Sequence, residues 1–269
     1  MGFGPAAGFG RLNHESTTLT LRSITKLIAQ ESVKTLLPRL PRPLGAAVLR
    51  AASRKSARLG RLGFRPDGPP AGMEHFVKHR CIFVHIPKCA GTSVITALSD
   101  QPALHWKLSY YRLVFQPEQF RDFFKFTFVR NPWDRLVSGY HYMRDGGSPE
   151  APSDLEWSER HIRRYADFDD FVLHGLPRLE IRRWLTFVPQ HEFVTLPWRR
   201  GPQVDFIGKV ENMEQDFRQV SERLAISAPL ETRNRSQRGA DYHSYYSLRT
   251  RAIVERYYAE DIKMFGYEF

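Results

Sequence analysis

The sequence predicts an α/β fold, a three-layer sandwich in which a central parallel β-sheet is flanked by helices. Three observations lead to this prediction: short apolar runs typical of buried parallel strands, a helical pattern after each run, and the repetition of this strand–helix unit along the chain. With 269 residues, of which 42% are hydrophobic, the chain can hold one large domain and an appendage.

The first two units lie in the middle of the chain. Residues 81–86, CIFVHI, form an apolar run with β-branched residues, and a helix is predicted over 92–99. Residues 124–129, FKFTFV, form the second predicted strand. The helix over 132–144 follows it and begins with Pro132, a residue that favours the first position of a helix. We expect the two strands to pair in parallel.

The third unit completes the predicted sheet. A strand over 206–210 precedes a helix whose apolar residues recur at i, i+4, i+7 and i+11: Met213, Phe217, Val220 and Leu224. The C-terminal segment 247–265 is predicted to be helical, with Ile253, Tyr257 and Ile262 facing inward. Residues 146–158 are predicted to be an open loop.

The first 72 residues differ from the rest of the chain in charge. They hold twelve Lys and Arg against three acidic residues, so they carry +9 of the net charge of +11 and leave +2 for the remainder. Five Pro and Gly residues between 66 and 72 place a domain boundary near Met73. We therefore predict a mobile basic extension over 1–72 and a folded domain over 73–269.

Composition bears on partners and location. Because the positive charge is not interleaved with aromatic residues in a nucleic-acid-binding module, no nucleic acid is expected as a partner. The first 72 residues contain no long uncharged apolar run, so neither a signal peptide nor a membrane anchor is predicted. Residues 19–37 could form a basic amphipathic helix on anionic lipid, and a mobile tail is the alternative. Cys81 and Cys89 alone support neither a disulfide framework nor a zinc site. A cytoplasmic protein, with peripheral membrane contact as an option, is predicted.

The segment 83–93, FVHIPKCAGTS, has the composition of a phosphate-binding loop. A strand that ends in a turn and opens a helix presents backbone N–H groups and the positive end of a helix dipole to an anion. The residues of this predicted loop are Pro87, Lys88, Cys89, Ala90, Gly91, Thr92 and Ser93. Lys88 precedes Gly91 by three residues, unlike the Walker order of nucleoside triphosphatases. An ordinary turn with a surface lysine is the alternative.

Cys89 raises the hypothesis of a phosphatase nucleophile, because a cysteine in such a loop can be activated by the helix dipole. That chemistry needs an arginine six residues later, where this sequence has Ile95. Cys89 is therefore interpreted as a small residue that fills the loop.

The segment 128–140, FVRNPWDRLVSGY, supplies a second group of anion-binding residues. Arg130 follows the second strand, and Ser138 comes eight positions later, about two helical turns on, so that both could reach one phosphate. With this segment and the phosphate loop, the sequence resembles the PAPS-dependent sulfotransferases, in the carbohydrate-type and bacterial branch (sulfotransferase family 2-like), where PAPS is 3'-phosphoadenosine 5'-phosphosulfate. The resemblance continues through 205–217, 234–238 and 257–269.

The resemblance implies a P-loop-like form of the α/β sandwich and a set of donor-binding residues. Residues 87–93 would hold the 5'-phosphosulfate, and Arg130 and Ser138 the 3'-phosphate. Arg235 and Ser236 look like a late nucleotide-binding loop, with a solvated polar turn as the alternative. PAPS would be the co-substrate, and the acceptor a hydroxyl group of a glycan, a glycolipid or a small metabolite.

The chemistry follows from the charges. Sulfuryl transfer leaves negative charge on the departing oxygen, and Lys88 is the natural stabiliser of that charge; no metal is expected, because Arg, Ser and backbone donors already anchor the leaving group. A hydroxyl acceptor needs a general base. We predict His105 in this role, and the other candidates are His85, His141, His191 and Glu192. The alternatives to this enzyme are a nucleotide-dependent kinase and a non-catalytic nucleotide-binding scaffold at a membrane.

Overall fold

The computed structural model describes residues 73–99, 105–149, 151–196, 199–227 and 241–269. Its sheet has three parallel strands in the order β1-β2-β3. These are β1 (Cys81–Val84), β2 (Phe124–Val129) and β3 (Phe206–Lys209). The predicted α/β class and parallel sheet are confirmed, although β1 and β3 end earlier than predicted. Because the strands are parallel, their carboxyl ends lie at one edge of the sheet.

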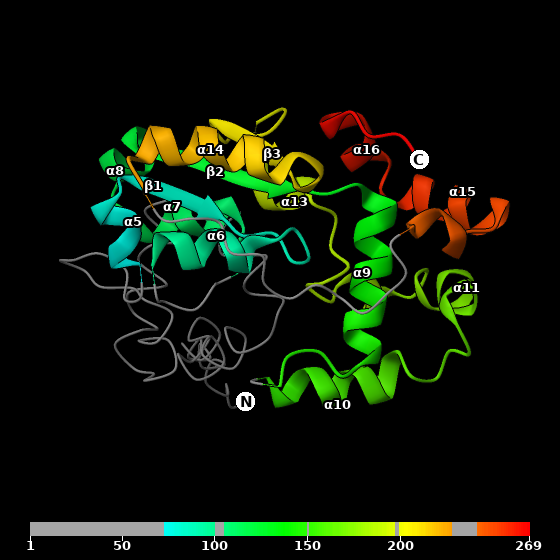
Figure 1. Ribbon diagram of the computed structural model, residues 1–269. Coiled ribbons are helices and arrows are strands. Elements are labelled where there is room, and N and C mark those ends of the chain that lie inside the picture. Colours follow the sequence, from blue (N-terminus) through cyan, green and yellow to red (C-terminus); the bar gives the residue numbers. More distant parts are fainter. Residues whose placement is uncertain (1–72, 100–104, 150, 197–198, 228–240) are drawn as a thin grey trace, which may run out of the picture.

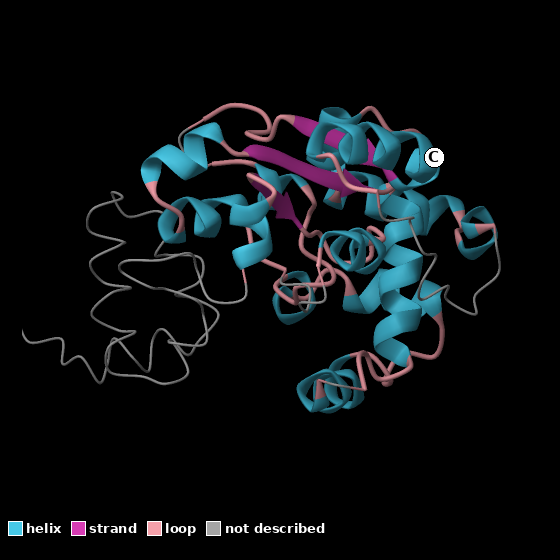
Figure 2. Ribbon diagram, turned by 60° about the vertical axis from the view of Figure 1, so that its left-hand side comes forward, coloured by secondary structure: helices cyan, strands magenta, loops and turns pink. Residues whose placement is uncertain are grey.

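Helices flank this sheet. In Figure 1, α14 lies on one side of the strands, and α6 and α7 lie on the other; from a second direction the three strands again form one layer among helices (Figure 2). The helices that precede β3 are α5 (Glu74–Lys78), α6 (Gly91–Leu98), α7 (Leu108–Val114), α8 (Pro117–Asp122), α9 (Pro132–Arg144), α10 (Pro152–His161), α11 (Phe168–Asp170), α12 (Leu179–Arg182), α13 (His191–Val194) and the π-helical turn η2 (Phe171–Gly175).

The helices after β3 are α14 (Met213–Leu224), α15 (Leu248–Tyr257) and α16 (Ala259–Phe265), with the 3-10 turns η3 (Val210–Asn212) and η4 (Tyr242–Tyr245). The predicted helix over 132–144 is confirmed as α9, and the helix predicted over 92–99 is confirmed as α6, one residue earlier. No helix in these described segments is long and apolar enough to cross a bilayer.

The buried side chains of the described residues form two hydrophobic clusters, and the sheet lies at the centre of the first. Phe126 of β2 is fully buried and its ring stacks on that of Phe83 in β1, with centroids 5.0 Å apart. The hydroxyl of Thr127, also buried, donates to the carbonyl oxygen of Val84 at 2.7 Å. Burial on both faces explains why these strands read as continuous apolar runs in the sequence.

The second hydrophobic cluster surrounds α9. Leu136, Tyr140 and Met143 are buried in it, beside Phe171 of η2 and Val254 of α15. Figure 1 shows α9 running away from the end of β2, with α10 crossing its far end. The helix therefore connects the edge of the sheet to the second cluster.

One sequence prediction is wrong, and a second needs refinement. Residues 146–158 are not an open loop throughout, because α10 begins at Pro152 and the buried Ser158 hydroxyl donates to the carbonyl oxygen of Met143. The segment 247–265 is two helices, α15 and α16, that meet at Tyr258. Val254, Tyr258 and Phe265 are buried, and the predicted inward residues Ile253, Tyr257 and Ile262 are half-buried and pack against the second cluster.

Candidate functional site

The loop between β1 and α6 has an unusual backbone. Lys88 and Ala90 have φ angles of 67° and 54°, in the left-handed region, and Cys89 between them does not. Alternation of this kind turns successive N–H groups towards one side and forms an anion-binding concavity. Ala90 is also the N-cap of α6, and its side chain has no acceptor for the first N–H groups of that helix. The backbone geometry of this loop is therefore one that could bind an anion.

Gly91 is required at the start of α6 by a neighbouring side chain. A Cβ atom at this position would lie 1.9 Å from Cδ2 and 2.1 Å from Nε2 of His85. The His85 ring is buried and lies between Phe83 and His105, at centroid distances of 5.6 and 4.0 Å. The glycine lets the imidazole pack beneath the loop between β1 and α6.

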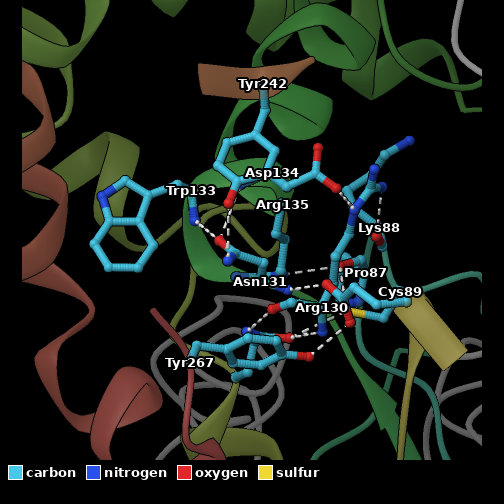
Figure 3. Close-up of polar contacts among 12 residues, drawn as sticks. Pro87, Lys88, Cys89, Arg130, Asn131, Trp133, Asp134, Arg135, Tyr242 and Tyr267 are labelled. Atoms are coloured by element: carbon cyan, nitrogen blue, oxygen red, sulfur yellow. Dashed lines mark hydrogen bonds and ion pairs between the residues drawn. The ribbon is translucent and has the colours of Figure 1, made fainter. Parts of the chain in front are cut away.

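Arg130 joins the end of β2 to this loop. Its Nη1 donates to the carbonyl oxygen of Lys88 at 3.4 Å, and its Nε donates to Oδ2 of Asp134, one turn into α9, at 2.6 Å. Figure 3 shows these groups together, with Pro87 and Cys89 on the loop side. The side chain is 17% exposed, and a guanidinium has five N–H donors, so these two contacts do not exhaust its capacity to bind an anion.

Arg135, a residue that sequence reasoning did not single out, fixes the loop from below. Its side chain is 1% exposed. Nε donates to the carbonyl oxygen of Pro87 at 3.0 Å, and Nη2 donates to those of Thr186 and Val188 at 3.1 and 2.9 Å. The sequence offered one signal, a basic residue next to the apolar face of the predicted helix. It could not indicate the bonding partners, because Pro87, Thr186 and Val188 are distant in sequence.

Gln190, which was also missed, links the two candidate anion-binding elements. Its fully buried side chain donates from Nε2 to the carbonyl oxygen of Arg130 at 2.8 Å. Its Oε1 accepts from the Arg130 backbone N–H at 2.9 Å and from the Cys89 thiol at 3.2 Å. Asp261 of α16 holds the Gln190 backbone N–H at 2.7 Å. No local pattern marks Gln190, because its role arises from contacts across the fold.

Comparison with protein families identifies the family of this chain. The family model described as the sulfotransferase family matches residues 76–268, which is most of the chain. The chain belongs to the sulfotransferase family. Comparisons with curated proteins and with solved structures gave no significant match. Membership indicates an enzyme that transfers a sulfuryl group to a hydroxylated acceptor.

His105 of this sulfotransferase lies beside His85, at the start of the loop between β1 and α6. Its Nδ1 is 3.2 Å from the carbonyl oxygen of His85, and since a carbonyl only accepts, this contact assigns the proton to Nδ1 and the lone pair to Nε2. Burial lowers the pKa of His105 to about 4; the hydrogen bond to His85 opposes this shift, and the charges of Lys88 and Arg135 add to it. The imidazole is therefore neutral at neutral pH.

The other candidate bases lie in different settings. Burial, followed by the charges of His105 and Lys88, lowers the pKa of His85 well below its usual value. His141 lies on α9 with its ring 5.2 Å from that of Tyr245. Burial disfavours the charged form of His191, but its hydrogen bond to Asp261 outweighs this and raises the pKa. Glu192 is paired with Lys107 at 2.5 Å. His105 is thus the neutral imidazole beside the loop whose tautomer is assigned by a backbone contact.

The remaining predicted site residues differ in how much the structure says of them. Ser138 is buried on α9, and no hydrogen bond between it and Arg130 is found in the described part of the chain. Ser93 is buried in the first turn of α6, and Thr92 beside it is half-buried. Arg235 and Ser236 lie outside the described residues. Among the predicted site residues, the loop and Arg130 thus have contacts that join them, whereas no such contact is found for Ser138 in the described part of the chain.

Cys89 and potential metal ligands complete the site. Burial raises the pKa of the Cys89 thiol to about 12, so the thiol stays protonated and donates to Gln190. Both cysteines are free and buried. Among the residues that the structure describes, no group of three or more His, Cys, Asp or Glu side chains is arranged to hold a metal ion.

Proposed function

We propose that this sulfotransferase is a PAPS-dependent O-sulfotransferase, with its catalytic domain at 73–269 in a P-loop-like sandwich. The observation that carries the proposal is the contact between Arg130 and the Lys88 carbonyl oxygen, because it brings cations from two adjacent strand ends to one edge of the sheet. Such an edge is where parallel α/β proteins bind nucleotides. Two separate anionic groups, as in PAPS, match two cationic elements better than a single phosphate would.

The described residues fit such a donor. In this proposal, the loop residues Pro87, Lys88, Cys89, Ala90, Gly91, Thr92 and Ser93 hold the 5'-phosphosulfate with the turned backbone and the start of α6. Arg130 and Ser138 hold the 3'-phosphate, and Arg235 and Ser236 add contacts from a later loop. Gln190 would keep the two elements in register, because its side chain bonds to both.

PAPS supplies a sulfuryl group on a phosphate leaving group. Lys88 would stabilise the negative charge that develops on the departing oxygen, and fixed donors aimed at developing charge are among the strongest catalytic devices. His105 would accept the acceptor's hydroxyl proton at Nε2. Because the cations and N–H groups of the protein can balance the charge of the leaving group, we propose that no metal is needed.

The acceptor in this proposal is a hydroxyl group on a glycan, a glycolipid or a small metabolite. The domain beyond residue 72 carries only about +2 of charge, which gives no preference for a polyanionic acceptor. We further propose a cytoplasmic location, with the basic extension free to touch anionic membranes.

A transfer assay tests this function. The protein is incubated with PAPS carrying radioactive sulfur and a lysate as the source of acceptors, and the labelled product is isolated. We expect label transfer by the wild type and a loss of about 10²–10³-fold in rate for Lys88→Met. Lys78→Met, at an exposed lysine of α5, is the matched control and should retain the wild-type rate.

Thermal unfolding distinguishes a PAPS-dependent sulfotransferase from a nucleotide-dependent kinase. Only a ligand that binds the native state raises the melting temperature, so desulfated PAPS should protect the protein more than ATP does. Greater protection by ATP, together with no labelled product, would contradict the proposal.

A further inference from the structure

The ammonium group of Lys88 has a defined aromatic neighbour. Its Nζ lies 3.9 Å from the ring centroid of Tyr142, well within the range of a cation–π interaction. Tyr142 is two residues from the end of α9, whereas Arg130, which contacts the Lys88 carbonyl oxygen, directly precedes this helix's N-cap residue. The lysine is therefore held at its backbone and at its side chain from opposite ends of one helix.

Tyr142 is itself held in place by Asp154. The tyrosine hydroxyl donates to Oδ2 of Asp154 at 3.2 Å, and the same oxygen accepts from the Ser148 backbone N–H at 3.3 Å. Asp154 lies in the first turn of α10, where a carboxylate is favoured by the helix dipole. Burial and the neighbouring Asp154 raise the pKa of Tyr142 to about 12, so the hydroxyl keeps its proton.

A glycine makes this approach possible. Gly147 has a φ angle of +78°, and a Cβ atom there would lie 2.4 Å from Cβ of Asp154. The turn between α9 and α10 can therefore fold closely enough for Asp154 to reach Tyr142. The sequence-based prediction of an open loop at 146–158 did not include this connection.

We propose that Tyr142 is a positioning residue for Lys88, and that Asp154 holds its ring in place. This inference rests on the proposed sulfuryl transfer, in which Lys88 stabilises the leaving oxygen. An aromatic face attracts an ammonium group without neutralising it. Tyr142 thus orients the ammonium group of Lys88, and Asp154 bonds to the tyrosine hydroxyl on the other side of the ring.

Substitutions separate the ring from its anchor. Tyr142→Leu removes both the aromatic face and the hydroxyl, so we expect kcat to fall about 2- to 30-fold, the range of a cation–π contact. Tyr142→Phe keeps the ring and should retain most of the activity. Asp154→Ala should behave like Tyr142→Phe, and the double variant should be little worse than either, because both changes break the same hydrogen bond. Glu156→Ala, on the exposed side of α10, is the control.

A second measurement does not depend on turnover. The rate at which an amine-reactive reagent modifies Lys88, followed by mass spectrometry, should rise several-fold in Tyr142→Leu and less in Asp154→Ala, and stay at the wild-type value in Glu156→Ala. Unchanged modification of Lys88 in Tyr142→Leu would overturn the inference. Should that variant not fold, unchanged modification in Asp154→Ala would do so. If the wild type transfers no sulfuryl group, the proposed function fails, whereas the modification result still reports on the Lys88–Tyr142 contact.

Discussion

His105 and Lys88 place a neutral imidazole beside a cation. Burial favours the neutral form of His105, and the positive charge of Lys88 lowers the pKa further, to about 4. A base with this pKa is weaker than free imidazole, but an anionic donor next to Lys88 would cancel part of that positive charge. The same binding step would therefore bring the donor and strengthen the proposed base.

The lowered pKa of His105 predicts a specific pH dependence of the sulfuryl-transfer rate. In the free enzyme, reported by kcat/KM, the acid limb assigned to His105 should lie near pH 4, well below the pKa of about 6.5 for an unperturbed histidine. In the complex, reported by kcat, the limb should move to higher pH, because negative charge stabilises the imidazolium. Rates of the wild type between pH 4 and 9 check both expectations.

Variants assign the limb to a residue. His105→Ala should lower kcat by about 10²–10⁴-fold, the usual contribution of a general base, and should remove the acid limb. His174→Ala is the control, since that side chain is 67% exposed. An unchanged rate in His105→Ala would eliminate this residue as the base.

At the scale of single elements, local patterns predicted the strand–turn–helix units well. β1, β2, α6 and α9 follow the apolar runs and the helix-start signals of the sequence, because parallel strands buried on both faces leave a clear signature. The turn after α9 was missed, since a stretch with Gly, Ser and Pro reads as a loop although Pro152 opens a helix.

The residues that hold the site together could not be predicted in the same way. Arg135 bonds to carbonyl groups about fifty residues away in sequence. Gln190 bonds to Arg130, 60 residues away, and to Cys89 of the loop, 101 residues away. A hydrogen bond of this kind depends on how elements pack, and neither residue lies in a pattern of spacing that indicates its partner. Local signals therefore indicated the candidate anion-binding residues but not the residues that support them.

The turn between β1 and α6 allows a sharp test of packing. Gly91→Ala would place a methyl group 1.9 Å from the nearest atom of the His85 ring, so we expect a loss of roughly 1–3 kcal/mol in the free energy of unfolding. His85→Ala removes that ring. The double variant should cost about 1–3 kcal/mol less than the sum of the single variants, measured by urea unfolding.

A second glycine serves as the control for this cycle. A methyl group at Gly139 on α9 would meet Thr186 and Phe187 and not His85. Gly139→Ala combined with His85→Ala should therefore be additive. Additivity of Gly91→Ala with His85→Ala would show that the ring does not determine the need for glycine at the start of α6.

At the scale of the whole molecule, the C-terminal segment connects the two hydrophobic clusters. Val254 and Tyr258 are buried in the cluster around α9, whereas Phe265 and Tyr267 are buried in the cluster of the sheet. Asp261 lies between them, and its carboxylate holds the backbone at Gln190. We therefore expect the two clusters to unfold together, in one transition with a single midpoint.

Because the two clusters are expected to unfold together, buried histidines should affect the stability of both. Burial lowers the pKa of His75 to about 4, and neither of its ring nitrogens has a hydrogen-bond partner in the described part of the chain. His105 has the same folded-state pKa of about 4. The unfolded chain binds these protons near pH 6.5, so the stability that these two groups contribute is present above that pH and is lost as the pH falls towards 4. His191 has the opposite sign, because its pKa is raised.

The free energy of unfolding should therefore decrease between pH 7.5 and pH 5, by about 2 kcal/mol for each of His75 and His105. His75→Phe removes one of these groups and can keep the aromatic contact with Phe76, so its loss over this interval should be about 2 kcal/mol smaller than that of the wild type. Urea midpoints at the two pH values measure the difference, with the exposed His174→Ala as the control.

Since the two unbonded nitrogens also cost stability when neutral, His75→Phe should unfold at higher urea than the wild type even at pH 7.5. An equally steep loss in wild type and His75→Phe would mean that His75 gains its proton at the same pH in both states, and the buried, uncharged imidazole would no longer explain acid sensitivity.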